Sequence, residues 1–248
     1  MPCQPAPTSP RATRAFGRTS GPTFSTRRAR FGAQAVACLS VLLSAPLMAQ
    51  TTPVTPKEHA SNNGLRAVAV GGTLASWAYA WWEGAPFTRC DGAPRWQFRG
   101  NVAKDDELRV ATVGAAYGEC QMLTAGGWSL SNQTNFSVSR WSAQGDVAFA
   151  KNAWDVAIVP LVHWQRPAFG ATRMEVEFGI GPAWLSQTNI GDRQKSTQYQ
   201  FSDHLGLNLV DAGGAWRVGL HWRHISNLDI KTPNNGVDFA GVVVAFSL

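Results

Sequence analysis

The fold of this chain is decided by one stretch, residues 215–227, with the sequence AWRVGLHWRHISN. Successive residues alternate in character along this stretch, and alternation with a period of two predicts a β-strand with two different faces. The face formed by the even-numbered positions carries Trp216, Val218, Leu220, Trp222, His224 and Ser226. An apolar face therefore runs along the strand and ends in an imidazole and a hydroxyl group.

The chain turns after this strand and returns as a second one. Residues 233–236 are Pro-Asn-Asn-Gly, which is typical turn chemistry. Residues 237–247 again have apolar side chains at most even positions, and this face opens with Asp238. We therefore expect His224, Ser226 and Asp238 to meet at one end of a hairpin, where they form the parts of a serine-hydrolase relay.

Similar short segments separated by turn signals extend upstream. The predicted strands are residues 108–117, 121–130, 135–149, 153–165, 172–187, 198–210, 213–226 and 237–247. Eight strands are an even number, and each is long enough to cross a bilayer as a tilted strand of about 9–11 residues. The pattern predicts an all-β protein, an eight-stranded antiparallel transmembrane β-barrel with an N-terminal extension.

The alternation also indicates which face of the sheet is inside. In a soluble barrel of the lipocalin type the apolar face would line the interior, whereas in a membrane barrel it faces lipid. The polar faces of neighbouring strands carry charges that can neutralise one another inside a narrow lumen: Glu175, Glu177, Arg217, His221 and Arg223. This pattern favours the membrane barrel, with His204 and His221 in the interior polar network. Asp203 falls on the lipid side, so it should lie near an interface or pair with a neighbour.

The C-terminal part of the chain resembles the lipid A 3-O-deacylase (PagL) family of outer-membrane esterases. The residues that carry this resemblance are His224-x-Ser226-Asn227, the Pro-Asn-x-Gly turn at 233–236, Asp238, and the segments Glu177-Phe-Gly-Ile-Gly181 and Gln200-Phe-Ser-Asp-His-Leu-Gly206. The match is good over residues 172–248 and holds only in pattern over 108–171. The family more often has glutamate where this chain has Asp238, whose side chain is one methylene shorter.

The chemistry of the residues and the resemblance together suggest roles. Ser226 would be the nucleophile, His224 the general base and then acid, and Asp238 the group that orients the imidazole. The resemblance implies that Asn234 donates a hydrogen bond to the oxyanion, with the backbone N–H of Gly236, and that Asn227 supports the site. It implies a serine-type carboxylic ester hydrolase that removes the 3-position acyl chain of lipid A, with no metal and no cofactor.

The resemblance also implies a substrate and a cellular location, while two other classes of function stay open. The expected substrate is lipid A, or lipopolysaccharide, and the expected location is the cell outer membrane, with the active site toward the outer leaflet. We expect no nucleic-acid partner, and a homodimer is the assembly considered. Two other classes stay open: a non-catalytic barrel with a structural or adhesive role, and a soluble lipid-binding barrel.

The N-terminal part of the chain contains a predicted secretory signal over residues 1–49. It holds six arginines and no acidic residue, followed by an apolar run at 35–47 and a cleavage motif ending at Ala49. Without it the chain has 22 − 6 = 16 basic residues against 16 acidic ones, so the basic charge is no argument for nucleic-acid binding. Residues 50–107 are an extension of uncertain structure, and 108–248 are the predicted barrel. Cys90 and Cys120 are expected to lie on opposite sides of the membrane, unbridged.

Overall fold

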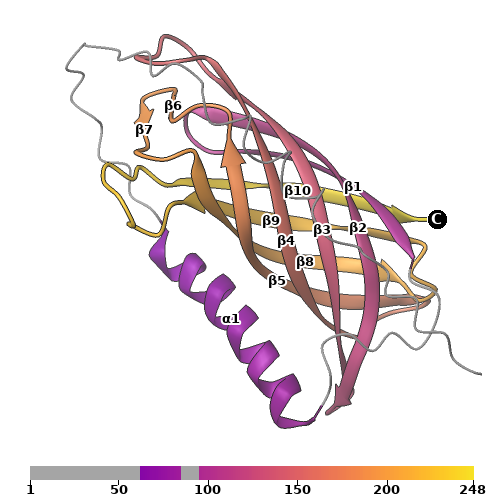
Figure 1. The fold of residues 1–248 in the computed structure, drawn as a ribbon. Helices are drawn as coiled ribbons and strands as arrows, with labels where there is room; N and C mark the ends of the chain where they lie inside the picture. The colour runs from indigo at the N-terminus through magenta and orange to yellow at the C-terminus, as the bar shows by residue number, and fades with distance from the viewer. Residues whose placement is uncertain (1–61, 85–94) are drawn as a thin grey trace, which may run out of the picture. The chain divides into compact units, whose positions relative to one another are not determined.

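A computed structural model describes residues 62–84 and 95–248. Eight strands close into an antiparallel barrel in the order β1-β10-β9-β8-β5-β4-β3-β2, and the last strand pairs with the first (Figure 1). The barrel strands are β1 (Trp96–Lys104), β2 (Leu108–Ala125), β3 (Trp128–Ala143), β4 (Asn152–Pro167), β5 (Thr172–Leu185), β8 (Tyr199–Asp211), β9 (Trp216–Ser226) and β10 (Val237–Ser247). The short strands β6 (Asn189–Ile190) and β7 (Arg193–Gln194) form a separate hairpin between β5 and β8. The predicted eight-stranded antiparallel barrel is confirmed.

The first strands differ from the prediction. The barrel begins at Trp96 and not at 108, and the three predicted segments over 108–149 are two long strands, β2 and β3. The break predicted between residues 117 and 121 contains Gly118, which lies inside β2, where the register with β3 shifts between Tyr117 and Cys120. The actual turn is at Gly126 and Gly127, which both have positive φ (56° and 79°), as a tight two-residue hairpin turn requires. The predicted signal segment lies outside the described residues.

The lumen of the barrel is filled by paired charges. Arg99 donates two hydrogen bonds to Glu177, at 2.8 and 2.9 Å, and Arg223 pairs with Asp155 in the same bidentate way. Arg217 lies 2.7 Å from Glu175. Buried charges are tolerated when they are paired and hydrogen-bonded, whereas a lumen that holds an apolar lipid must itself be apolar. The alternative of a soluble lipid-binding barrel is therefore wrong.

The outer wall of the barrel is apolar, as the alternation predicted. The exposed large apolar side chains on the barrel strands include Val113, Phe136, Ile158, Leu207, Leu220, Val242 and Phe246. Charges inside and an apolar band outside are the arrangement of a barrel whose wall faces lipid. Among residues 62–84 and 95–248, no helix has the length and hydropathy that are needed to cross a bilayer.

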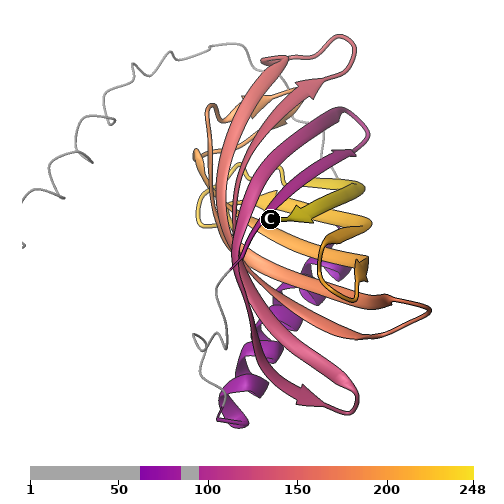
Figure 2. The same ribbon diagram turned by 90° about the vertical axis from the view of Figure 1, so that its right-hand side faces the viewer.

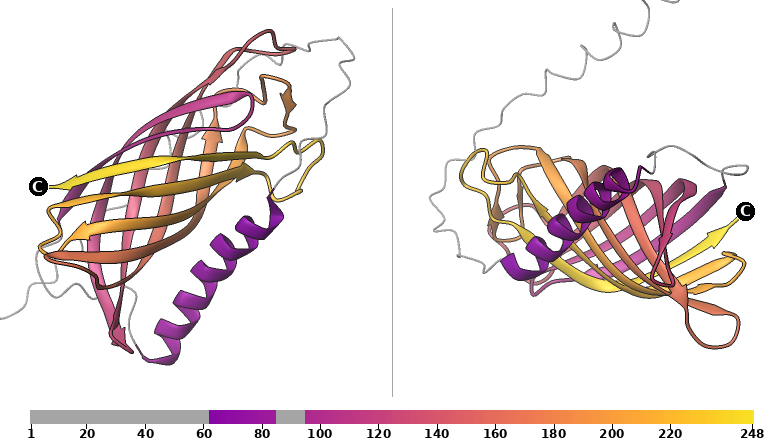
Figure 3. Two further views of the ribbon diagram at one scale, coloured as in Figure 1. Left: turned by 180° about the vertical axis from the view of Figure 1, so that it is seen from behind. Right: turned by 90° about the horizontal axis from the view of Figure 1, so that it is seen from below.

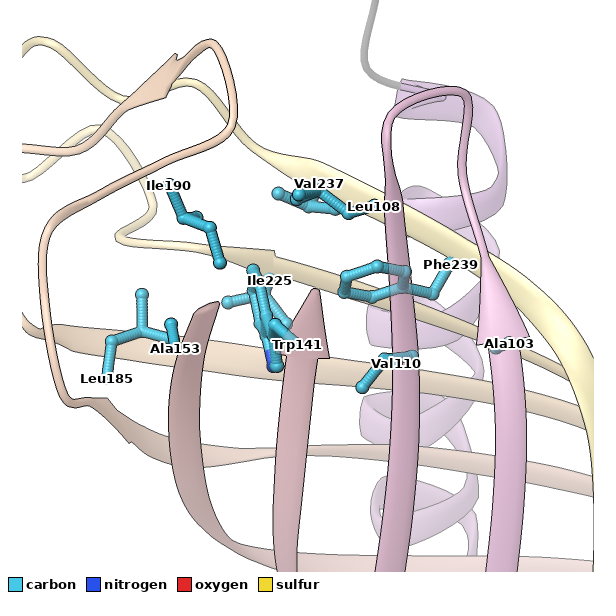
Figure 4. Packing of buried hydrophobic residues seen from close by; sticks show 10 residues of the cluster. All are labelled: Ala103, Leu108, Val110, Trp141, Ala153, Leu185, Ile190, Ile225, Val237 and Phe239. Atoms are coloured by element: carbon cyan, nitrogen blue, oxygen red, sulfur yellow. The ribbon is translucent and has the colours of Figure 1, made fainter. Parts of the chain in front are cut away.

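An apolar cluster closes the lumen at one end. It contains Trp141 and Phe239, whose rings meet edge to face at 4.9 Å, together with Ile225 and Val237 (Figure 4). Ile225 lies between His224 and Ser226, and Val237 and Phe239 flank Asp238. Inward-pointing side chains of the β9–β10 hairpin are thus anchored in this cluster, which fixes the backbone that carries the predicted site residues.

Helix α1 (Asn63–Trp82) lies in the predicted extension and packs on the outer wall against β5 and β8 (Figures 2 and 3). The side that it buries consists of small residues, Ala69, Thr73, Ser76 and Ala80, which allow close approach. A Cβ on Gly72 would lie 2.6 Å from Phe178, so this contact admits only glycine. The Ser76 hydroxyl accepts a hydrogen bond from the Trp164 indole at 2.8 Å. The helix is therefore seated on the barrel by specific contacts.

The placement of Cys120 corrects one expectation. Trp96, at the start of β1, pairs with Tyr117, so Cys120 lies at the end of the barrel where β1 begins. The sequence had placed it at the opposite end, because the first strand was assigned too late. Cys120 is disulfide-bonded, and Cys90 lies outside the described residues. The premise for separating the two cysteines is wrong.

Candidate active site

The β9–β10 hairpin brings two of the three predicted catalytic residues into contact. His224 and Asp238 are direct cross-strand partners. The Nδ1 atom of His224 lies 2.7 Å from Oδ1 of Asp238. Since an ionised carboxylate only accepts hydrogen bonds, Nδ1 carries the proton and Nε2 is left as the basic nitrogen. The shorter aspartate side chain thus reaches the imidazole without difficulty.

Ser226 and His224 each have one buried polar atom that forms no hydrogen bond with the described residues. Both residues are almost fully buried, yet within the described part of the chain neither Ser226 Oγ nor His224 Nε2 has a hydrogen-bond partner. Buried polar atoms are nearly always paired, so two adjacent exceptions mark a place where something else is to be bound. The serine and the imidazole are not hydrogen-bonded to each other here, and such catalytic contacts often tighten only when substrate binds.

Gly236 lies against both residues. A Cβ at this position would be 2.7 Å from His224 Cε1 and 3.6 Å from Ser226 Cβ. The imidazole and the serine therefore border one small space whose third side is the backbone of Gly236. This explains why the turn has glycine at this position, a reason that the sequence did not reveal.

The site lies on the outer wall of the barrel. Along β9, Arg217 and Arg223 bind acidic partners in the lumen, whereas the alternate residue Leu220 is 64% exposed. His224 and Ser226 have the same parity as Leu220. The His224 ring stacks on Trp222 with 5.9 Å between centroids and 17° between planes. The His224–Asp238 pair and the apolar outer surface of the barrel thus adjoin on one face.

The predicted supporting amides brace the loop that follows β9. The side-chain oxygen of Asn234 accepts a hydrogen bond from the backbone N–H of Asn227 at 3.0 Å, and its Nδ2 donates to Asp229 at 2.8 Å. Asn227 donates to the carbonyl of Lys231 at 2.7 Å. In this state Asn234 and Asn227 hold the loop conformation, and the oxyanion role of Asn234 stays a prediction.

A second brace comes from the β6–β7 hairpin, which sequence reasoning missed. Lys195 is buried, and its Nζ donates to the carbonyls of Ile225 (3.1 Å) and Asn235 (2.7 Å). Arg193 donates to the carbonyl of Gly236 at 2.6 Å. Burial, with the nearby Arg193 guanidinium, lowers the pKa of Lys195 to about 7. Isolated basic residues in a loop give no sequence signal, because their role depends on distant carbonyl groups.

The first turn of α1 also reaches the site. The backbone N–H of Asn62 donates to Oδ2 of Asp238 at 2.7 Å. Arg66 Nε lies 3.5 Å from the carboxylate of Asp203, which is fully buried and faces His224 across the β8–β9 pair. The partner that Asp203 was expected to need is thus Arg66. The sequence alone did not identify Asn62, the N-cap of α1, or Arg66, because it did not place the segment that contains them.

Two lumenal clusters have the composition of metal ligands. Within residues 62–84 and 95–248, Glu177, His204 and His221 form one, and Glu119, His163 and Glu175 the other. Their carboxylates are already neutralised, since Arg99 binds Glu177 and Arg217 binds Glu175. His204 and His221 are hydrogen-bonded to each other at 2.9 Å, as members of the interior network. These four groups are thus engaged with other groups of the interior network.

Comparison with known proteins identifies a family and two relatives that match this chain. The family model described as Lipid A 3-O-deacylase (PagL) matches residues 111–247, more than half of the chain. A lipid A deacylase PagL from Bordetella bronchiseptica is 30% identical over 122 residues, which are 49% of this chain and 65% of that protein. The Pseudomonas aeruginosa protein of the same name is 38% identical over 63 residues, 25% of this chain and 36% of that protein. The match thus spans less than two thirds of each relative.

A solved structure shares the fold. The crystal structure of the outer membrane enzyme PagL superimposes with a TM-score of 0.52 at 20% identity, and the match covers 63% of this chain and all of that one. The matched region of the family model contains β9, β10 and the loop between them. The chain therefore belongs to the lipid A 3-O-deacylase (PagL) family.

Proposed function

We propose that this protein is a serine-type esterase of the outer membrane, which hydrolyses the ester-linked acyl chain at the 3-position of lipid A. The observation that carries the proposal is the arrangement at the end of the β9–β10 hairpin. A histidine held by a carboxylate presents an Nε2 that has no partner among the described residues, and a serine hydroxyl that likewise has none there lies beside it, on the outer wall of a membrane-type barrel. Family membership supports the choice of substrate.

The reaction follows from these groups. Ser226 Oγ attacks the ester carbonyl while its proton passes to His224 Nε2, and Asp238 stabilises the imidazolium that forms. The tetrahedral intermediate then collapses, and the sugar oxygen leaves with the proton from His224. Water, activated by the same imidazole, hydrolyses the acyl–serine ester and releases the fatty acid. Donors at the oxyanion contribute a further rate factor of about 10²–10³, and the N–H groups of Asn234 and Gly236 are the proposed donors.

The location of the site suits a membrane substrate. Acyl chains of a lipid already lie against the outer wall, so the ester can reach Ser226 without leaving the bilayer. We place the site toward the outer leaflet, which holds lipopolysaccharide. A homodimer stays a prediction of the sequence, and native mass spectrometry of the detergent-solubilised protein would decide it.

The test is mass spectrometry of lipid A from cells that express the chain. We expect the wild type to produce lipid A lacking one ester-linked acyl chain, and Ser226→Ala to leave lipid A intact. Ser142→Ala is a suitable control, because it removes a hydroxyl from β3, which does not adjoin β9 or β10. Intact lipid A with the folded wild type would instead favour the non-catalytic barrel, and deacylation by Ser226→Ala would remove the nucleophile assignment.

A further inference from the structure

The amino end of α1 contacts both carboxylates that flank His224. We propose that this first turn is a positioning element of the active site: the backbone N–H of Asn62 fixes the plane of the Asp238 carboxylate, and Arg66 neutralises Asp203. The inference rests on the proposed esterase function and adds to it a part of the chain that lies before the barrel. Asn62 and Asp238 are 176 residues apart in sequence.

The two oxygens of Asp238 have different partners. Oδ1 accepts from His224 Nδ1 at 2.7 Å, and Oδ2 accepts from the Asn62 N–H at 2.7 Å. With a single hydrogen bond the carboxylate could rotate about its last torsion and carry the imidazole with it. The second bond removes that freedom. Because a misplacement of about 1 Å in a catalytic group costs up to about 10²-fold in rate, this anchor matters for turnover.

Asp203 explains the role of Arg66. This carboxylate is fully buried on the outer wall and faces His224, and Arg66 is its only ion-pair partner among the described residues. A buried carboxylate without a counter-charge is strongly disfavoured. Without Arg66, Asp203 would be a second acid near the imidazole and would compete with Asp238 for its proton. Arg66 therefore directs the imidazole toward the acid that orients it.

The contacts of α1 indicate that the helix positions the active-site carboxylates and does not block the reacting atoms. A helix that blocked the site would satisfy the hydroxyl of Ser226 or Nε2 of His224, yet both atoms stay without a partner. Among the described residues, the polar contacts that this end of the helix makes with the barrel are those to the two carboxylates. Further along, α1 is held by the close fit of Gly72 on Phe178 and by the bond from Trp164 to Ser76. The helix thus supports the acid side of the relay and leaves the reacting atoms open.

Asn62 allows a direct test, because the proposed contact is a backbone N–H. Proline lacks that N–H, and its fixed φ near −65° fits the observed φ of −78°. The side chain of Asn62 also caps the helix by accepting from Leu65 N. Asn62→Ala is the matched control, since it loses the same cap and keeps the N–H. We expect kcat of Asn62→Pro to be at least tenfold below that of Asn62→Ala, with the same KM.

The role of Arg66 is tested by substitutions that change the charge at positions 66 and 203. Arg66→Ala should lower kcat about tenfold or more, Arg66→Lys should recover much of the loss, and Arg66→Ala with Asp203→Asn should recover it as well, because the unpaired charge is then removed. A loss due to poor helix docking alone would not be repaired by Asp203→Asn. Failure of both Arg66→Lys and the double variant to recover activity would overturn the role of Arg66.

A second readout does not depend on hydrolysis. In ¹⁵N-histidine spectra of the full chain in micelles, we expect the His224 Nδ1–H signal to be sharp in Asn62→Ala and broadened or shifted in Asn62→Pro. Equal kcat and equal spectra for these two variants would overturn the positioning role. A faster Asn62→Pro enzyme would show that α1 is a lid. If the wild type hydrolyses no lipid, the proposed function fails, and the spectra alone then decide the contact.

Discussion

Gly236→Ala offers a sharp test of how the site is built. Gly236 does not have a left-handed φ, so alanine brings no backbone strain, and the effect is confined to the space beside the relay. The new Cβ would lie 2.7 Å from His224 Cε1. Carbon atoms prefer a separation of about 3.5–4.0 Å, so the imidazole must move by about 1 Å.

The size of the effect follows from that displacement. A shift of about 1 Å in a catalytic group lowers turnover by about 10²-fold, which corresponds to about 2.7 kcal/mol in the activation free energy. The fold should persist, because one added methyl group in a packed site costs about 1–3 kcal/mol. We therefore expect kcat to fall about 10²-fold in a folded protein.

The assay is release of fatty acid from lipid A in mixed micelles, with heat-modifiable gel mobility as the check of folding. Gly100→Ala is the matched control: it lies on β1, beside β10, and its Cβ would meet only Val244 Cγ2 at an ordinary 3.7 Å. Gly236→Ala with the activity of Gly100→Ala would refute the view that Gly236 forms one side of the reaction space.

Four further predictions concern the relay, the brace and the outer wall. Ser226→Ala and His224→Ala should each lower deacylation by about 10³-fold or more, measured on the folded protein; a smaller loss would speak against a relay. Asp238→Glu should remain active and Asp238→Ala should not, in the same assay; an Asp238→Ala variant as active as the wild type would show that Asp238 does not orient the imidazole. The pKa of Lys195 is lowered from 10.5 to about 7, so between these pH values the unfolded chain binds more protons than the folded one. The free energy of unfolding should therefore rise with pH from about 7 to 10.5. Urea unfolding in micelles should show this rise in the wild type and less of it in Lys195→Met. A nitroxide at Leu220, which is exposed on the wall, should be relaxed by oxygen dissolved in lipid, whereas one at Asp146, in an exposed loop, should respond to a water-soluble nickel chelate; the reverse pattern would contradict the placement of the wall in lipid.

Most of the barrel could be predicted because alternation is a local property. The strands predicted at 153–165, 172–187, 198–210, 213–226 and 237–247 correspond to β4, β5, β8, β9 and β10. The prediction failed at β1 to β3, where local signals mislead. Gly118 lies in an irregular part of a strand, and the polar run at 131–135 is part of β3, with Ser131, Gln133 and Asn135 buried on the lumenal face, and does not form a turn. A residue pattern cannot distinguish a polar turn from a polar lumen without the partner strand.

Some residues of the candidate site could be predicted from the sequence, and others could not. His224, Ser226 and Asp238 could be predicted, because they lie in one hairpin whose register follows from alternation and a turn. Lys195, Arg193, Asn62 and Arg66 could not, because their partners are backbone carbonyls or carboxylates on other elements. The types of the neighbouring residues do not indicate those partners.

The sequence by itself thus determined an apolar wall around a charged lumen, with a histidine, a serine and an aspartate at the end of the β9–β10 hairpin. Local periodicity suffices for this, since each strand must place its charges away from lipid. Only the tertiary structure decided what surrounds that trio. The β8–β9 hairpin sets Asp203 beside His224, and packing of α1 on the wall brings Asn62 to Asp238 and Arg66 to Asp203. Contacts across such sequence distances depend on how the surfaces fit together, and no local pattern encodes that fit.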